Sequence, residues 1–132
     1  MVIKLITVLV LVGHGLGHVM APQAAFVPPG AFPRNAHAAL VGLTIGSTAG
    51  KALSLLWLFP MVGFVLGTYG LWINAPWYRP LLVVSAVVSI TAVLPWWKVM
   101  PAFSYLGALA IDALVLVAVL TPSGDQLIRS FR

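Results

Sequence analysis

Two histidines, His14 and His18, lie one helical turn apart in the run VGHGLGH, inside a segment that is otherwise apolar. Residues four apart share one face of a helix. In a hydrocarbon environment a polar ring is tolerated only where it faces protein or water. The spacing therefore predicts an inward-facing pair of imidazoles, which suits binding of a divalent cation or relay of protons.

Asp112 is the natural complement of this pair, because it is the only carboxylate inside an apolar segment; the other, Asp125, lies in the tail. An unpaired carboxylate at the middle of a membrane is costly, so a partner is expected. The helical rise places His14 roughly 10 Å and Asp112 roughly 15 Å below the same membrane surface. We therefore predict that His14 and Asp112 meet.

Other polar side chains point to the same region. Tyr105 is seven residues before Asp112 and shares its face, Ser85 and Ser89 share a face of the third apolar segment, and His37 follows the first. We expect His37 to fold over the mouth of the site near His18. The candidates for a ligand or proton site are Asp112, Tyr105, Ser85 and Ser89, and those for a metal are His14, His18 and His37.

Several chemistries are excluded because the chain has no cysteine and no glutamate. Thiolate metal sites, disulfides and carboxylate-rich di-iron sites are ruled out. The histidine pair also lacks the glutamate base of the zinc-protease motif. Two histidines on one helix cannot flank a haem iron, so a bis-histidine haem would need His37 or a second copy of the chain.

A structural interpretation of the histidine pair stays open beside the functional one. Gly13 and Gly17 form a small-xxx-small pattern, which lets helices approach closely in membranes. In this interpretation both imidazoles only make hydrogen bonds to neighbouring helices. Whether the chain is an enzyme is left undecided at this stage.

The composition indicates an integral membrane protein. Of the 132 residues, 61% are hydrophobic and only 7% are charged, against about 25% charged in soluble domains. The mean hydropathy is +1.08. The length allows four spans of about 20 residues. We predict an all-α, four-helix membrane bundle that forms one domain over residues 1–132, with spans at about 2–20, 52–73, 81–97 and 102–120.

The connections carry the helix-breaking residues. Pro22 marks the end of the first span, and prolines at 28, 29 and 33 favour an extended start to the first connection. Asn35 is then expected to cap a short additional helix that runs to about Ile45 and ends at Gly46. At the other end of the chain, the run 121–124, TPSG, is expected to end the last helix before a short polar tail.

The second span contains two signals for helix geometry. Pro60 removes a backbone hydrogen bond and predicts a kink. Gly63 and Gly67 lie four apart and predict close approach of a neighbouring helix.

The first apolar segment has a second interpretation as a cleaved signal peptide, since small residues near 19–21 loosely fit a cleavage site. The two histidines and Pro22 argue against cleavage there. The seven Lys and Arg are scattered over the connections, which fits lipid headgroups and not a nucleic-acid surface. Lys4, Arg79, Arg129 and Arg132 fall on one predicted side, so we expect both termini in the cytoplasm.

The run HGLGH at 14–18, the glycines of the second span, the run WYRP at 77–80 and Gly107-Ala108 before Asp112 are similar to a group of uncharacterised small prokaryotic membrane proteins. These proteins have four spans and an HGxxH motif in the first helix. The resemblance implies a four-span protein of a prokaryotic cytoplasmic membrane, and it implies no activity.

Three functional hypotheses follow. The first is a small membrane protein that binds a cation or relays protons at an intramembrane His/Asp site. The second is a membrane enzyme or redox subunit that binds a metal, haem or quinone. The third is a structural partner, either in a homo-oligomer or in a larger membrane complex. The lipid bilayer is an expected partner in all three, and nucleic acid in none.

The predicted topology can be tested with reporter fusions after Gly30 and at the C-terminus. The two fusions should report opposite sides of the membrane, because one apolar segment precedes the first site and four precede the second. Reporters on the same side, or a mature protein that begins near Pro22, would contradict the four-span arrangement.

Overall fold

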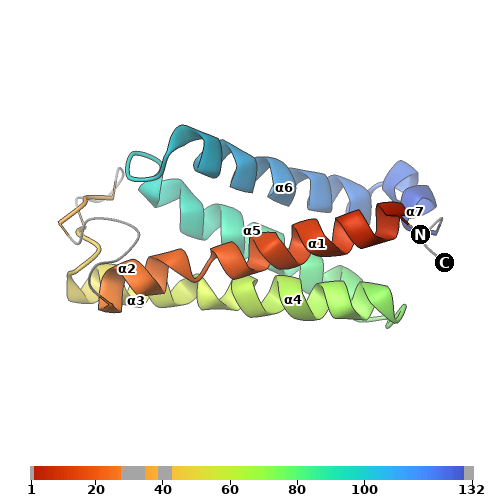
Figure 1. The fold of residues 1–132 in the computed structure, drawn as a ribbon, viewed down its shortest axis with the longest axis horizontal. Coiled ribbons are helices and arrows are strands. Elements are labelled where there is room, and N and C mark those ends of the chain that lie inside the picture. The colour runs from red at the N-terminus through yellow and green to blue at the C-terminus, as the bar shows by residue number, and fades with distance from the viewer. Residues whose placement is uncertain (1, 28–34, 39–42, 130–132) are drawn as a thin grey trace.

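The computed structural model describes residues 2–27, 35–38 and 43–129, and these are mainly helical (Figure 1). The helices follow one another along the chain with short interruptions. They are α1 (Val2–Gly17), α2 (Met20–Phe26), α3 (Thr48–Leu56), α4 (Leu58–Trp72), α5 (Tyr78–Val93), the short 3₁₀ helix η1 (Leu94–Trp96), α6 (Ala102–Leu120) and α7 (Pro122–Arg129).

Four helical segments in the described part of the chain are long and apolar enough to cross a membrane: Val2–Phe26, Thr48–Trp72, Tyr78–Trp96 and Ala102–Leu120. This confirms the predicted all-α class and the four apolar segments. In space, α4 packs against α1 and α5, and α5 packs against α6. The contact between α1 and α6 is much less extensive, so these two helices border a seam along the bundle (Figure 1).

The first segment does not end before Pro22, contrary to the sequence prediction. The chain turns at His18 and Val19, and α2 then carries the helix on to Phe26. A proline ring clashes with the carbonyl four residues earlier, here that of His18. The break at His18 relieves this clash, and Pro22 then lies in the first turn of α2, where its missing N–H needs no partner.

The second segment shows the predicted kink. It is interrupted at Trp57, between α3 and α4 and three residues before Pro60. The first and second segments are therefore both broken just before a proline. The two breaks are neighbours, since the rings of His18 and Trp57 lie 5.5 Å apart between centroids.

The glycines of α4 allow the predicted close packing. A Cβ atom at Gly63 would lie 2.0 Å from Ser85 Oγ, and one at Gly67 would lie 2.6 Å from a methyl carbon of Leu82. Both contacts are with α5, which confirms that these glycines bring a neighbouring helix close.

The glycines of α1 behave differently from the prediction. At Gly13 and Gly17 a Cβ would meet no atom within 4 Å, whereas at Gly15 it would lie 2.9 Å from Phe64 Cβ and 3.1 Å from the Met61 carbonyl oxygen. Within this chain the packing glycine of α1 is therefore Gly15. The small-xxx-small pair faces open space.

The expected short helix in the first connection is absent from the described residues on either side of 39–42. The backbone of His37 instead forms an antiparallel bridge with Thr44. Ala38 N donates to Leu43 O at 2.7 Å, and Ile45 N donates to Ala36 O at 3.1 Å. Such cross-strand bonds require extended backbone, so Asn35 does not cap a helix here. Pro28, Pro29, Pro33 and residues 39–42 lie outside the described residues.

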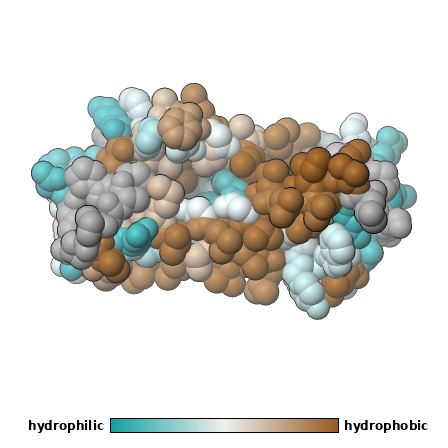
Figure 2. Space-filling model, viewed as in Figure 1, coloured by the Kyte–Doolittle hydropathy of each residue, from teal (hydrophilic) through white to brown (hydrophobic). Residues whose placement is uncertain are grey.

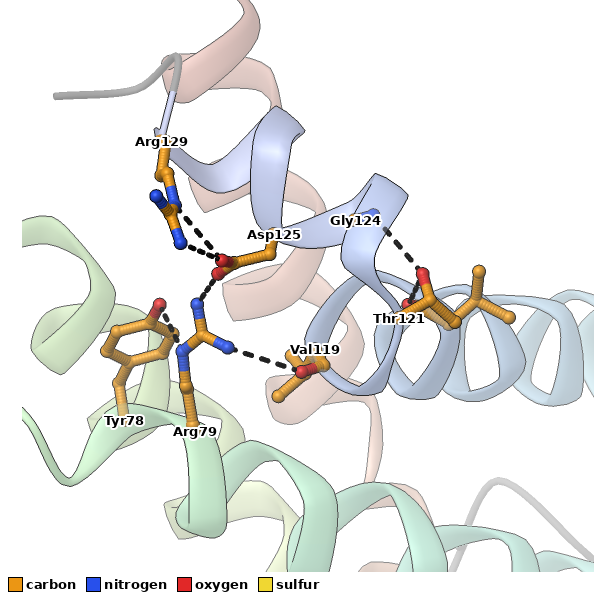
Figure 3. Close-up of polar contacts among 8 residues, drawn as sticks. Tyr78, Arg79, Val119, Thr121, Gly124, Asp125 and Arg129 are labelled. Atoms are coloured by element: carbon orange, nitrogen blue, oxygen red, sulfur yellow. Dashed lines mark hydrogen bonds and ion pairs between the residues drawn. The ribbon is translucent and has the colours of Figure 1, made fainter.

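The polar tail is a helix, α7, and not an irregular end. The last apolar helix, α6, does end at Leu120, as predicted. Pro122 then occupies the first position of α7, where proline is favoured. Asp125 accepts hydrogen bonds from Arg129 at 3.0 and 2.7 Å and pairs with Arg79 at the start of α5 (Figure 3). The i, i+4 spacing of Asp125 and Arg129 is the sequence signal for this helix.

Basic residues mark both ends of the bundle. Lys4, Arg79 and Arg129 lie at the end that holds both chain termini, where Lys4 Nζ donates to Trp72 O at 3.3 Å (Figure 1). Lys51 and Lys98 lie at the opposite end and contact the rings of Phe26 and Trp97. Hydrophobic residues dominate much of the surface between the ends (Figure 2).

The position of Gly15 against α4 gives a stability prediction. Gly15→Ala should lower the free energy of unfolding by about 1–3 kcal/mol, because the added methyl group overlaps Phe64 and the backbone of Met61. Denaturant unfolding of the purified protein in detergent measures this change. Gly13→Ala and Gly17→Ala are the matched controls and should cost nothing. A loss at the controls with none at Gly15 would contradict the assigned packing face.

Candidate functional site

The predicted meeting of His14 and Asp112 is present in the structure. His14 Nε2 lies 2.8 Å from Asp112 Oδ1, and this pair joins α1 to α6 across the seam. The Asp112 side chain is completely buried and that of His14 is 5% exposed. The helical rise places the two residues within about one turn of the same depth, and the structure shows that they are in contact.

Ser89 of α5 holds the second carboxyl oxygen. Its Oγ lies 2.6 Å from Asp112 Oδ2 and 2.8 Å from His18 Nε2. Ser89 is completely buried, and His18 is 3% exposed. Four side chains thus form one chain of hydrogen bonds, in the order His14, Asp112, Ser89, His18. We call them the polar network.

The helix break at His18 completes the network. The backbone N–H of His18 donates to Gly15 O at 3.1 Å, and the imidazole Nδ1 of His18 lies 3.0 Å from His14 O. The side chain of His18 thus bonds a carbonyl that a continuous α-helix would pair with the N–H of residue 18. Pro22, which causes the break, in this way helps to orient the second imidazole.

Aromatic side chains fix both imidazole rings. The His14 ring packs edge-on against Phe64, with centroids 4.8 Å apart, and against the His18 ring at 4.9 Å. Trp57 lies on the other side of His18 and donates its indole N–H to Ala92 O at 3.1 Å. The sequence analysis missed Phe64 and Trp57. Only the proline three residues after Trp57 pointed to this part of α4.

Two distributions of protons with zero net charge give each hydrogen bond of the polar network one donor and one acceptor. In the first, Asp112 is ionised and accepts from His14 Nε2 and Ser89 Oγ, while a doubly protonated His18 donates to Ser89 Oγ and His14 O. In the second, Asp112 is protonated and donates to Ser89, Ser89 donates to His18 Nε2, and His18 is neutral. Both have zero net charge, and they differ by one proton moved between His18 and Asp112 through Ser89.

In both arrangements His14 donates through Nε2 and carries no proton on Nδ1. Among the described residues, every completely buried side-chain nitrogen or oxygen has a hydrogen-bond partner. His14 Nδ1 has none, so this atom is open to the cavity that His14 lines between α1 and α6. Figure 2 shows hydrophilic surface in the hollow between these two helices.

Three candidates from the sequence lie outside the polar network. Ser85 is buried one turn from Ser89, but its Oγ donates to Leu81 O at 2.7 Å and packs on Gly63. Tyr105 packs against the hydrophobic cluster that includes Trp57, and its hydroxyl takes part in none of the hydrogen bonds of the described residues. His37 is exposed on its bridge with Thr44.

The histidines do not assemble into a metal centre in the described part of the chain. No group of three or more His, Cys, Asp or Glu side chains there is placed to hold an ion. The Nε2 atoms of His14 and His18 are instead bonded to Asp112 and Ser89. The two rings lie 4.9 Å apart on one segment, which also prevents them from flanking a haem iron.

Comparisons with known proteins do not place the chain in a family: no protein-family model, curated protein or solved structure matches it. The resemblance drawn from the HGxxH motif therefore stays a prediction.

Ser89 and Ser85 provide a matched pair for testing the network. Ser89→Ala should lower the free energy of unfolding by about 1–3 kcal/mol, because it leaves Asp112 Oδ2 and His18 Nε2 buried without a partner. Ser85→Ala removes only a bond to a carbonyl within its own helix and should cost less. Denaturant unfolding of both variants makes the comparison. Equal losses would show that the network adds nothing beyond a single buried hydroxyl.

Proposed function

We propose that this chain is an integral membrane protein whose polar network is a buried proton-exchange site. The observation that carries the proposal is the unbroken chain of hydrogen bonds from His14 through Asp112 and Ser89 to His18. It links two imidazoles and a carboxyl group, all able to gain or lose a proton, inside an otherwise apolar bundle. Ionisable groups within membrane segments are by default functional.

A membrane location is supported by the four apolar segments and their exposed side chains. Leu9, Leu106, Leu114 and Val117 are among the large hydrophobic residues that face outward, each more than half exposed. Such a surface suits lipid and would be unusual in water. The Lys and Arg residues at the end with both termini support a cytoplasmic position for that end. The resemblance carried by the HGxxH motif supports a prokaryotic membrane.

A proton suits the network better than a metal ion. Both Asp112 oxygens and both imidazole Nε2 atoms are engaged at 2.6–2.8 Å, so no set of free ligands surrounds a space for a cation. A proton needs no such space, since it moves along hydrogen bonds that already exist. Ser89, which can donate and accept, is the link that lets a proton pass between Asp112 and His18.

An apolar layer follows the polar network on the side of the chain termini. Toward the chain termini, the next helical turn places Leu11, Ala86 and Val115 directly below His14, Ser89 and Asp112, and all three are buried and apolar. This layer argues against a proton path across the whole membrane. Protons would instead be exchanged with whatever occupies the cavity beside His14, at Nδ1.

Solid-state NMR of the protein in lipid, with isotope-labelled histidine, tests the proposal. Nitrogen shifts distinguish protonated from unprotonated ring nitrogens. As the pH falls, His14 Nδ1 should change from unprotonated to protonated, while Nε2 stays protonated because Asp112 holds it. In Asp112→Asn this preference for Nε2 should be lost.

Asp125→Asn is the matched control, since it removes the other aspartate, at the surface, and should leave the His14 signals unchanged. His14 nitrogens that do not change over the pH range in which the protein is folded would reject proton exchange. The network would then have only the structural role of joining α1, α5 and α6.

A further inference from the structure

The cavity beside His14 has the size of a ligand site. It is partly open to the outside and has a volume of about 330 Å³ between α1 and α6, whereas a water molecule occupies about 30 Å³ in the liquid. Binding sites for small molecules span about 300–1,000 Å³. Gly13, Gly17 and Gly107 line it, and a Cβ at any of them would meet no atom within 4 Å.

The chemistry of the lining narrows the ligand class. Most of the wall is apolar, and it includes aromatic and thioether side chains, which favour contact with a flat ring: Met20, Trp57, Met100 and Phe103. The polar lining is confined to the two histidines and Ser104. An apolar wall with a few polar groups is typical of sites for small organic molecules.

The polar group that selects among such molecules is His14 Nδ1. The His14 side chain is 5% exposed, its Nε2 is bonded to Asp112, and Nδ1 is the acceptor left open to the cavity. This atom is accessible from the cavity and accepts from no donor of the described chain, so an occupant that supplies an N–H or O–H group would pair with it. A phenolic O–H fits best, because it lies on a flat ring and ionises near pH 10, far more readily than an aliphatic alcohol.

The same seam provides room for a tail. A second, larger cavity of about 500 Å³ follows α1 and α6 toward the chain termini, and Ile111 lines both cavities. Its lining is almost entirely apolar, from Ile6, Val10 and Leu11 on α1 to Leu114 and Val115 on α6. A ring held at His14 would therefore have an apolar channel beside it.

We propose that the seam between α1 and α6 binds a lipid phenol, that is, a membrane-soluble molecule with a hydroxylated aromatic ring and a long apolar tail. Reduced quinones belong to this class. The hydroxyl donates to His14 Nδ1, and the tail follows the second cavity. The proposal rests on the proposed function, because His14 Nδ1, which accepts from the hydroxyl, is also the atom that takes up a proton in the proposed exchange.

Titration of the protein in lipid nanodiscs with nonylphenol, and with its methyl ether nonylanisole as control, tests this site. The tryptophan fluorescence reports binding, since Trp57 lines the cavity. Nonylphenol should bind about tenfold more tightly than nonylanisole, as expected for one hydrogen bond that only the phenol donates. In His14→Phe, which keeps a ring and removes the nitrogen, the two probes should bind equally.

A second variant separates the cavity from the rest of the fold. Gly17→Leu places a side chain in the open space beside His14 and should abolish binding of both probes. Leu106→Phe adds bulk at a residue that is 60% exposed on the outer face of α6 and should leave binding unchanged. Equal binding of the two probes to the wild type, or undiminished binding to Gly17→Leu, would overturn the proposal.

Two further outcomes are distinguishable. Phenol binding without any change at His14 in the NMR titration would retain the ligand site and reject proton exchange, and the reverse pattern would reject the ligand site alone. Absence of binding together with disulfide formation between copies carrying Gly13→Cys would place a second copy of the chain on this face. The native chain has no cysteine, so such a bond would be unambiguous.

Discussion

A carboxyl group that is completely buried between apolar helices must find donors or a proton inside the protein, and Asp112 imposes this constraint on the whole bundle. Its partners come from two other helices, His14 on α1 and Ser89 on α5. The direct contact between α1 and α6 is small, so the hydrogen bond of His14 with Asp112 is a main link across their seam. The position of α6 therefore depends on this hydrogen bond as well as on packing against α5.

A break in a helix accompanies the network. In a continuous α1 the His14 carbonyl would accept from the N–H of residue 18, whereas here that N–H donates to Gly15 O and the His14 carbonyl accepts from the imidazole of His18. Pro22 prevents this continuity, and Pro60 breaks the neighbouring segment at Trp57. Since the two breaks lie side by side, the indole of Trp57 packs against the imidazole that the first break has turned inward. Two prolines outside the network thus shape it.

The part of the site that the sequence predicted follows from periodicity. The rise of an α-helix puts His14 and Asp112 within about one turn of the same depth, and this quantity can be computed from residue numbers. Periodicity cannot choose between Ser85 and Ser89, because they share one face. The choice is made by the height of α5 relative to α6, which places Ser89 and not Ser85 beside Asp112 and which residue numbers do not give. Pro22 was interpreted as a terminator because a proline early in a helix and one after its end look alike in sequence.

The glycines that line the seam between α1 and α6 connect the stability of the bundle with its function. In a helix interior, glycine is less stable than alanine by about 1 kcal/mol, and at Gly13 and Gly107 a methyl group would meet no atom. If these glycines served helix packing, atoms of a neighbouring helix would lie against them, as they do at Gly15 and Gly63. The open space lies beside the one imidazole nitrogen of the network that has no partner. Stability is thus lower where the seam is kept open, and this is the place where His14 can reach a molecule from outside the chain.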